Sequence, residues 1–246
     1  MGLGMNAAAN ALAATPVETV ADALDVMEQL DAALAPSDGV WSFNRLYWRV
    51  TLAVDASLHS GGWAWRDPEF IRILDVVFAN LYFSALRAAG GPPAVAPSAW
   101  RALFEARHRS GVARIQFALA GMNAHINRDL VAAVTGVCEQ LGIHPAHGTD
   151  QYADFTSVNA LLETVQEQVK HEFATELVGV ADEALGRLDD LLATWSVDAA
   201  REAAWCNAEI YWALPDIPLV EATFLRTLDR TVALVGRGLL IPLGVP

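Results

Sequence analysis

One segment near the middle of the chain, residues 112–130, restricts the possible fold more than any other. It has the pattern of a helix, and no charged residue lies between Arg114 and Arg128. A helix without a solvated face is normally buried on all sides. Yet Asp129 follows directly, and four polar residues lie inside the segment: Gln116, Asn123, His125 and Asn127. Because buried amides and imidazoles are costly unless they find partners, the segment predicts an internal polar network or a binding site.

Helix patterns dominate the rest of the chain, and strand patterns are weak. We expect helices over residues 15–34, 42–58, 70–89, 98–109, 112–141, 150–195, 196–214 and 218–235. Capping sequences mark three of the helix starts, at Thr15, Asp67 and Ser196. Without a repeat or a long linker, residues 15–246 are predicted to form a single all-α domain, after a mobile lead-in over residues 1–14. The predicted fold is an irregular bundle of about eight to ten helices around a central buried helix.

The composition argues against several kinds of partner. A formal net charge of −13 disfavours nucleic acid and anionic membrane surfaces. Hydrophobic residues make up 54% of the chain, but no run reaches the roughly 18 to 20 apolar residues that span a bilayer. Cys138 and Cys206 lie far apart without a partner motif, and the first residues lack a signal-peptide pattern. We therefore expect a cytoplasmic protein with free thiols.

His125 and Asp129 form the first candidate pair. They are four residues apart and fall on one face of the central helix, whereas the three amides of that helix fall on nearly the opposite face. An aspartate at this spacing can accept the imidazole N–H, which fixes the tautomer and raises the basicity, as in a general base. The alternative is a core histidine whose aspartate simply makes a hydrogen bond at a helix end.

Glu105 and His108 form a second pair. Their spacing places a carboxylate and an imidazole on one helical face, as in di-iron bundles. Such bundles need two of these pairs and two further carboxylates, and the sequence contains only one such pair. A surface pair flanked by arginines is the commoner explanation. The alternative that stays open is a metal site built from His108, His125, Asp129 and either Asp154 or His171.

Further candidates lie in apolar surroundings. Asp75 and Tyr82 share a face of an otherwise apolar helix, so Asp75 is either ion-paired or kept neutral by desolvation. The candidate ion partners are Arg45 and Arg107. Glu209 shares a helical face with Trp205 and Trp212, and tryptophans line apolar pockets as well as cores.

Three stretches carry a resemblance to a known family. They are Phe-Asn-Arg-Leu-Tyr-Trp-Arg-Val-Thr at 43–51, Leu-Asp-Val-Val-Phe-Ala-Asn-Leu-Tyr-Phe at 74–83, and 104–130 with its Asn-Ala-His-Ile-Asn-Arg-Asp core. They resemble an uncharacterised all-helical family, found mainly in high-GC soil bacteria. The resemblance spans about residues 40–215 and implies a helical fold with one shared polar feature. It implies no cofactor. Such families also occur beside genes for natural-product biosynthesis, which favours an enzyme.

The leading hypothesis is a cofactor-free acid/base enzyme that cyclises, eliminates, isomerises or hydrolyses a small, largely apolar metabolite. His125 would be the general base or acid, oriented by Asp129, and Glu105 with His108 would form a second proton-transfer pair. Substrate binding is assigned to Asn123, Asn127, Gln116, Asp75, Tyr82, Glu209, Trp205 and Trp212. The alternatives are a metal-dependent helical hydrolase or oxygenase that uses the same residues, and a non-catalytic binding or scaffold protein. The leading hypothesis includes no metal and is compatible with a homodimer.

Overall fold

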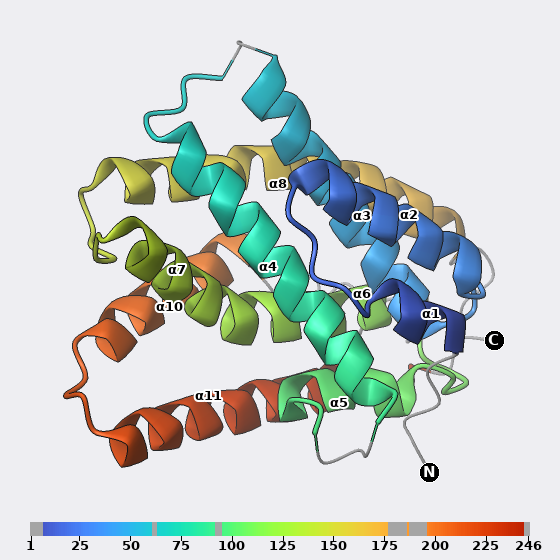
Figure 1. The fold of residues 1–246 in the computed structure, drawn as a ribbon. Coiled ribbons are helices and arrows are strands. Elements are labelled where there is room, and N and C mark those ends of the chain that lie inside the picture. The colour runs from blue at the N-terminus through green and yellow to red at the C-terminus, as the bar shows by residue number, and fades with distance from the viewer. Residues whose placement is uncertain (1–6, 61–62, 92–94, 177–185, 187–195, 244–246) are drawn as a thin grey trace.

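The computed structural model describes residues 7–60, 63–91, 95–176, 186 and 196–243, without the side chains of residues 166–176. Figure 1 shows the chain as a bundle of helices, and the described ranges contain no strand. The all-α prediction is therefore confirmed. The helices are α1 (Ala7–Leu12), α2 (Val20–Ala33), α3 (Gly39–His59), α4 (Pro68–Ala89), α5 (Ser98–Ala106), α6 (Arg114–Ala124), the π-helical turn η1 (His125–Asp129), α7 (Leu130–Leu141), α8 (Asp150–Glu176), α10 (Val197–Trp212) and α11 (Pro218–Leu239).

Capping residues explain where the helices begin. Asp67 and Ser196 cap α4 and α10 as predicted, each accepting a backbone N–H of the first turn. The predicted start at Thr15 is wrong. A capping box four residues later begins α2, where Asp22 N donates to Thr19 Oγ1 at 3.1 Å and Thr19 N donates to Asp22 Oδ2 at 3.0 Å.

The end of the expected lead-in also has regular structure. Residues 7–12 form α1, and the side chains of Ala9 and Ala13 are buried. Arg87 of α4 donates to the carbonyl oxygens of Ala13 and Ala14, at 3.1 and 2.9 Å. The mobility of residues 1–14 stays a prediction. The second part of the helical tract expected over 150–195 lies outside the described residues.

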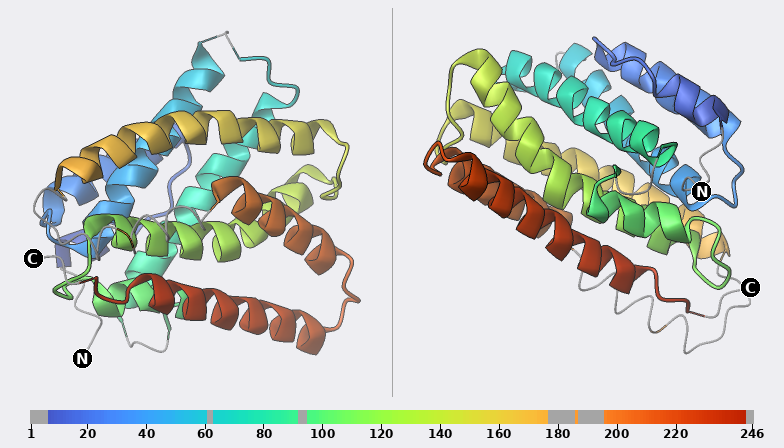
Figure 2. Two further views of the ribbon diagram at one scale, coloured as in Figure 1. Left: turned by 180° about the vertical axis from the view of Figure 1, so that it is seen from behind. Right: turned by 60° about the horizontal axis from the view of Figure 1, so that its bottom comes forward.

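The central helix of the fold is the continuous run α6–η1–α7. Helices α3 and α4 pack against one side of it, and α10 and α11 against the other. The right view of Figure 2 shows this order, from α2 on the outside through α4 and the central helix to α11. Almost every residue of α6 is therefore buried, as its lack of charged residues predicts.

No helix within the described ranges is both long and apolar enough to cross a membrane. The apolar surface of the central helix is covered by the neighbouring helices. Its glycine at position 121 allows a close approach, because a Cβ there would lie 2.4 Å from the ring of Phe43 on α3. The segment that holds His125 is thus surrounded by helices rather than by solvent.

Candidate functional site

His125 and Asp129 form a buried hydrogen-bonded pair. The distance from His125 Nδ1 to Asp129 Oδ2 is 3.1 Å, and both side chains are almost fully buried. Asp129 Oδ2 also accepts from Trp100 Nε1 at 2.7 Å, and Arg128 pairs with the other carboxylate oxygen. Because a carboxylate accepts hydrogen bonds, this geometry assigns the imidazole proton to Nδ1. Nε2 is then the basic nitrogen.

A π-helical turn places this pair. The backbone N–H of Leu130 donates to the carbonyl of His125, five residues back, instead of four as in an α-helix. Such turns insert one extra residue into a helix and occur frequently at functional sites. The spacing of four residues between His125 and Asp129 still brings their side chains together.

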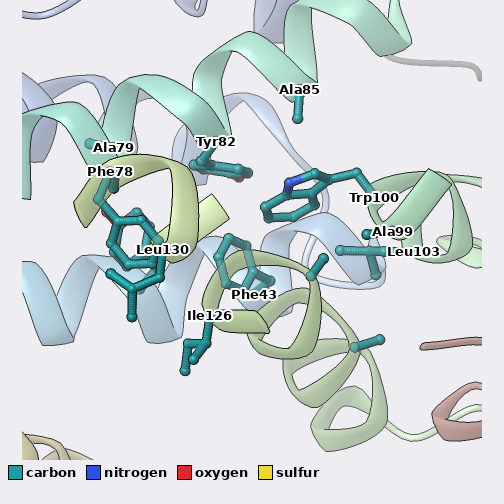
Figure 3. Packing of buried hydrophobic residues seen from close by; sticks show 14 of the residues in the cluster. Phe43, Phe78, Ala79, Tyr82, Ala85, Ala99, Trp100, Leu103, Ile126 and Leu130 are labelled. Atoms are coloured by element: carbon teal, nitrogen blue, oxygen red, sulfur yellow. The ribbon is translucent and has the colours of Figure 1, made fainter. Parts of the chain in front are cut away.

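The ring of His125 lines a small apolar cavity. Its volume is about 40 Å³, whereas one water molecule needs roughly 10–15 Å³. Phe78 stacks on the imidazole with ring centroids 3.5 Å apart, and Tyr47 meets it edge-on at 4.6 Å. Figure 3 shows how aromatic side chains from α3, α4 and α5 converge on this region. Aliphatic walls complete the cavity: Leu46, Val50, Met122, Ile126 and Leu162.

Two buried polar atoms in this region lack a hydrogen-bond partner among the described residues. They are Nε2 of His125, a residue that lines the cavity, and Oδ2 of Asp75. Asp75 lies one helical turn before Phe78 on α4, and its charge raises the pKa of Tyr47, whose hydroxyl also bonds the side chain of Thr51. Buried polar groups are nearly always satisfied in folded proteins. These two unsatisfied groups are therefore the feature that most needs a ligand to explain it.

The electrostatics of the cavity favour proton transfer. Burial lowers the pKa of His125 below its usual value, and the hydrogen bond to Asp129 opposes that shift only in part. The imidazole is thus neutral at pH 7. Burial raises the pKa of Asp75 to about 7, helped by the charge of Asp55 and opposed by Arg201. A neutral base therefore lines the cavity, and a carboxylic acid that is still partly protonated lies close enough to interact with Tyr47 and Arg201, two residues of the cavity lining.

The cations expected to pair with Asp75 have other partners. Arg45 bonds Asp31 at 3.0 Å, and Arg107 forms a buried ion pair with Asp38. The prediction of Arg45 or Arg107 as the partner of Asp75 is therefore wrong. The cation whose charge acts on Asp75 is Arg201 of α10, a buried residue that lines the cavity.

Arg201 is held in place by neutral acceptors. Its Nε donates to Asn159 Oδ1 at 2.7 Å, its Nη2 donates to the carbonyl of Phe155 at 2.6 Å, and its guanidinium lies over the Phe155 ring. This role was not predicted, because an arginine in an alanine-rich helix has the pattern of a solvated residue. Tyr47 and Phe78, which contact His125, were visible only as members of the resembling stretches.

Four residues predicted to bind substrate make internal hydrogen bonds. Gln116 Nε2 donates to the carbonyls of Leu239 and Ile241, both at 2.8 Å. Asn123 Nδ2 donates to Val232 O at 2.9 Å, and Asn127 donates to Asn123 Oδ1 at 3.2 Å. The Tyr82 hydroxyl donates to Asn44 at 3.3 Å. The amide side chains of Gln116 and Asn123 thus bind the central helix to α11 and to the chain that follows α11.

Glu105 and His108 line a different pocket from His125. Helix α5 ends at Ala106, so His108 lies in the following turn, and the two residues do not share a helical face as predicted. They line a surface pocket with Arg109 and Arg237, whereas none of these residues lines the His125 cavity. The fold therefore does not place Glu105 and His108 beside His125 and Asp129.

The predicted metal ligands are not gathered around His125. Asp154 accepts backbone N–H groups of Arg66 and Asp67, at 2.6 to 3.0 Å, and so fixes the chain before α4. The side chain of His171 lies outside the described residues. Within the described part of the chain, one group of side chains could hold a metal, and it lies elsewhere: His147, Cys206 and Glu209. Both cysteines are free thiols.

Glu209 and its neighbouring tryptophans lie in different surroundings. Trp205 is fully buried against Tyr152 and Phe155, whereas Trp212 is 40% exposed. Glu209 accepts the backbone N–H of His147 at 2.8 Å rather than lying between two indoles in a pocket. None of these residues lines the cavity of His125.

The comparisons with known proteins give one match. A family model described as "Family of unknown function (DUF5995)" matches residues 20–242. No curated protein and no solved structure matches the chain. The matched range runs from the start of α2 past the end of α11, so it includes every residue that lines the cavity.

Proposed function

The chain belongs to the family of unknown function DUF5995, and we propose that it is an acid/base enzyme acting on a small, largely apolar metabolite in natural-product biosynthesis. One observation carries this proposal. Asp129 holds His125 through Nδ1, the ring lines an apolar cavity, and Nε2 is buried without a partner among the described residues. A base oriented on one side and unsatisfied on the other is arranged to take a proton from a ligand.

The proposed step is a proton transfer at Nε2. Neutral His125 takes a proton from a substrate C–H or O–H group, and the Asp129 carboxylate stabilises the imidazolium that forms. The protonated carboxyl of Asp75 supplies a proton to the atom where negative charge develops, so that the net charge of the site is conserved. Cyclisation, elimination, isomerisation and hydrolysis all contain such a paired transfer.

The cavity limits what part of the substrate reacts there. A volume of about 40 Å³ accommodates only a few non-hydrogen atoms, whereas ligand pockets for whole metabolites are typically about 300–1,000 Å³. We therefore place the reacting end of the substrate, and not the whole molecule, beside His125. The apolar walls select an apolar end, because they offer a polar group no hydrogen-bond partner.

A second candidate function is non-catalytic binding of the same kind of ligand. The observation in its favour is that the amides of Gln116 and Asn123 serve packing against α11 and the segment that follows it. A central polar helix can thus be partly structural. Binding alone predicts that a ligand occupies the cavity and leaves unchanged.

The test compares variants on a mixture of substrates. Wild type and the His125→Phe and Asp129→Asn variants are incubated with an extract of small apolar metabolites, and mass spectrometry follows which masses disappear and which appear. We expect a substrate–product pair with wild type, and turnover lowered by about 10²-fold or more in both variants. His144→Gln, which alters an exposed histidine, is the matched control and keeps full turnover. No conversion by wild type, or equal conversion by His125→Phe, would contradict the proposal.

A further inference from the structure

A cluster of metal-ligand side chains lies where the loop between α7 and α8 meets α10. His147 of the loop is 2.7 Å from Glu209 through Nδ1 and 2.9 Å from Glu202 through Nε2. The Sγ of Cys206 lies 3.7 Å from Glu202 Oε1. Imidazole, thiol and carboxylate groups thus converge at one place, apart from the cavity of His125.

The spacing along α10 explains why these groups meet. Glu202, Cys206 and Glu209 follow one another at intervals of four and three residues, so their side chains share one face of the helix. That face is turned toward the loop, because His147 lies against it. The sequence alone contains no such indication, since His147 lies 55 residues before Glu202.

Hydrogen bonds from Tyr152, from the loop backbone and from Thr149 hold the members of the cluster in place. The Tyr152 hydroxyl donates to Glu202 Oε2 at 2.8 Å, and the backbone N–H of His147 donates to Glu209 Oε1 at 2.8 Å. The Thr149 hydroxyl donates to the carbonyl of Ala146 at 2.8 Å and so fixes the loop. Groups that orient the ligands in this way are a regular part of metal sites.

We propose that His147, Cys206 and Glu209 bind a zinc-type divalent ion, with Glu202 orienting the imidazole of His147 through Nε2. The ligand atoms of the three binding residues all lie within 4.8 Å of one another. Tetrahedral zinc requires separations of roughly 3.3–3.8 Å, which follow from its bond lengths. The side chains are partly exposed and can close this difference by small rotations. A thiolate with an imidazole selects zinc over magnesium or calcium, which prefer oxygen ligands.

The chemistry of the ligand groups is consistent with such an ion. Zinc binds a thiolate and a neutral imidazole, so metal binding displaces protons to solvent, and the dication then lies beside the acidic side chains. The bound ion would fasten the loop to α10, the helix that also carries Arg201 to the His125 cavity. This inference does not depend on the proposed function.

The test uses Co(II) as a spectroscopic probe of the tag-free, chelator-treated full chain. A thiolate bound to Co(II) gives a charge-transfer absorption that carboxylates and imidazoles alone do not give. We expect this band to saturate at one equivalent, to be lost in Cys206→Ser, and to remain in Cys138→Ala, which alters the buried thiol of the core. Competition with Zn(II) removes the band and reports the zinc affinity.

Further variants separate ligands from supporting residues. His147→Gln and Glu209→Gln are expected to lower the zinc affinity by about 100-fold or more, and Tyr152→Phe by about 10- to 100-fold through the loss of its bond to Glu202. Circular dichroism checks that each variant is folded. Absence of the band in wild type, or its persistence in Cys206→Ser, would overturn the proposal.

Discussion

The imidazole of His125 lies flat on the ring of Phe78, with centroids 3.5 Å apart and planes inclined by 5°. Asp129 holds the same imidazole through Nδ1 at 3.1 Å. The stack prevents the ring from tilting, and the hydrogen bond prevents it from rotating. The Nε2 atom therefore points in one fixed direction. Because Nε2 is buried without a partner among the described residues, it lowers the free energy of unfolding; such an atom costs about 1–3 kcal/mol. Function is the usual reason for retaining such an arrangement.

The Asp75→Asn variant tests the buried carboxyl group on α4. The pKa of Asp75 is about 7 in the folded protein against a usual value of 3.8. Between these values the folded state holds a proton that the unfolded state has released, so stability from this group is present below pH 3.8 and is lost as the pH rises through 7. Asp75→Asn should therefore raise the free energy of unfolding at pH 8 by about 1–3 kcal/mol.

Urea unfolding of wild type and Asp75→Asn from pH 4 to pH 9 measures this difference. The two stability curves should lie closest at the acid end, diverge as the pH rises from about 4 to 7, and keep a constant separation above that. Other carboxyl groups titrate in the same way in both proteins, so the difference between the curves isolates Asp75. Parallel curves over the whole range would show that the carboxyl has an ordinary pKa.

The hydrogen bond from Trp100 to Asp129 can be measured against a matched tryptophan. Trp100 and Trp205 are both fully buried, but only Trp100 Nε1 has a partner among the described residues. Replacement by phenylalanine removes similar apolar surface at both positions. Trp100→Phe should therefore cost about 1.5–3 kcal/mol more than Trp205→Phe, which is the contribution expected for a hydrogen bond to a charged group. Equal losses of stability in thermal unfolding would rule out this contribution.

The close approach of α6 to α3 predicts opposite effects for two glycine variants. A Cβ on Gly121 would lie 2.4 Å from the Phe43 ring, whereas a Cβ on Gly136 of α7 meets nothing within 4 Å. Gly121→Ala should destabilise the protein by about 1–3 kcal/mol, because Phe43 must move. Gly136→Ala should stabilise it by about 0.5–1 kcal/mol through helix propensity. Denaturant midpoints that shift in the same direction for both variants would contradict the observed packing.

Periodicity predicted the parts of the site that lie within one helix. Wheel geometry placed His125 with Asp129 and opposite the amides, and the structure shows that pair bonded and the amides of Gln116 and Asn123 facing the C-terminal segment. The π-helical turn was not predictable, because it depends on packing from several helices rather than on local sequence. Glu105 and His108 were misplaced because α5 ends one turn early.

Contacts between distant helices could not be predicted from one sequence. The cavity combines side chains of α3, α4, the central helix, α8 and α10, and nothing in the pattern of α10 distinguishes buried Arg201 from a solvated arginine. The contact of His147, in the α7–α8 loop, with Glu202 of α10 could not be predicted for the same reason. Spacing reveals which residues share a face of a helix, but only the fold shows what that face contacts.

The central claim is that the buried polarity of His125 serves function rather than folding. The His125→Phe variant tests it directly, since phenylalanine keeps the stack on Phe78 and its extra atom can enter the cavity. Asp129 would retain Trp100 and Arg128 as partners. The matched variant is Asn123→Leu, which leaves the carbonyl of Val232 without its donor.

The measurement is the free energy of unfolding of both variants in urea. We predict that His125→Phe is within about 1 kcal/mol of wild type or more stable, whereas Asn123→Leu loses about 1–3 kcal/mol. A loss above about 3 kcal/mol in His125→Phe would show that the histidine is a structural member of the core, and would contradict the account.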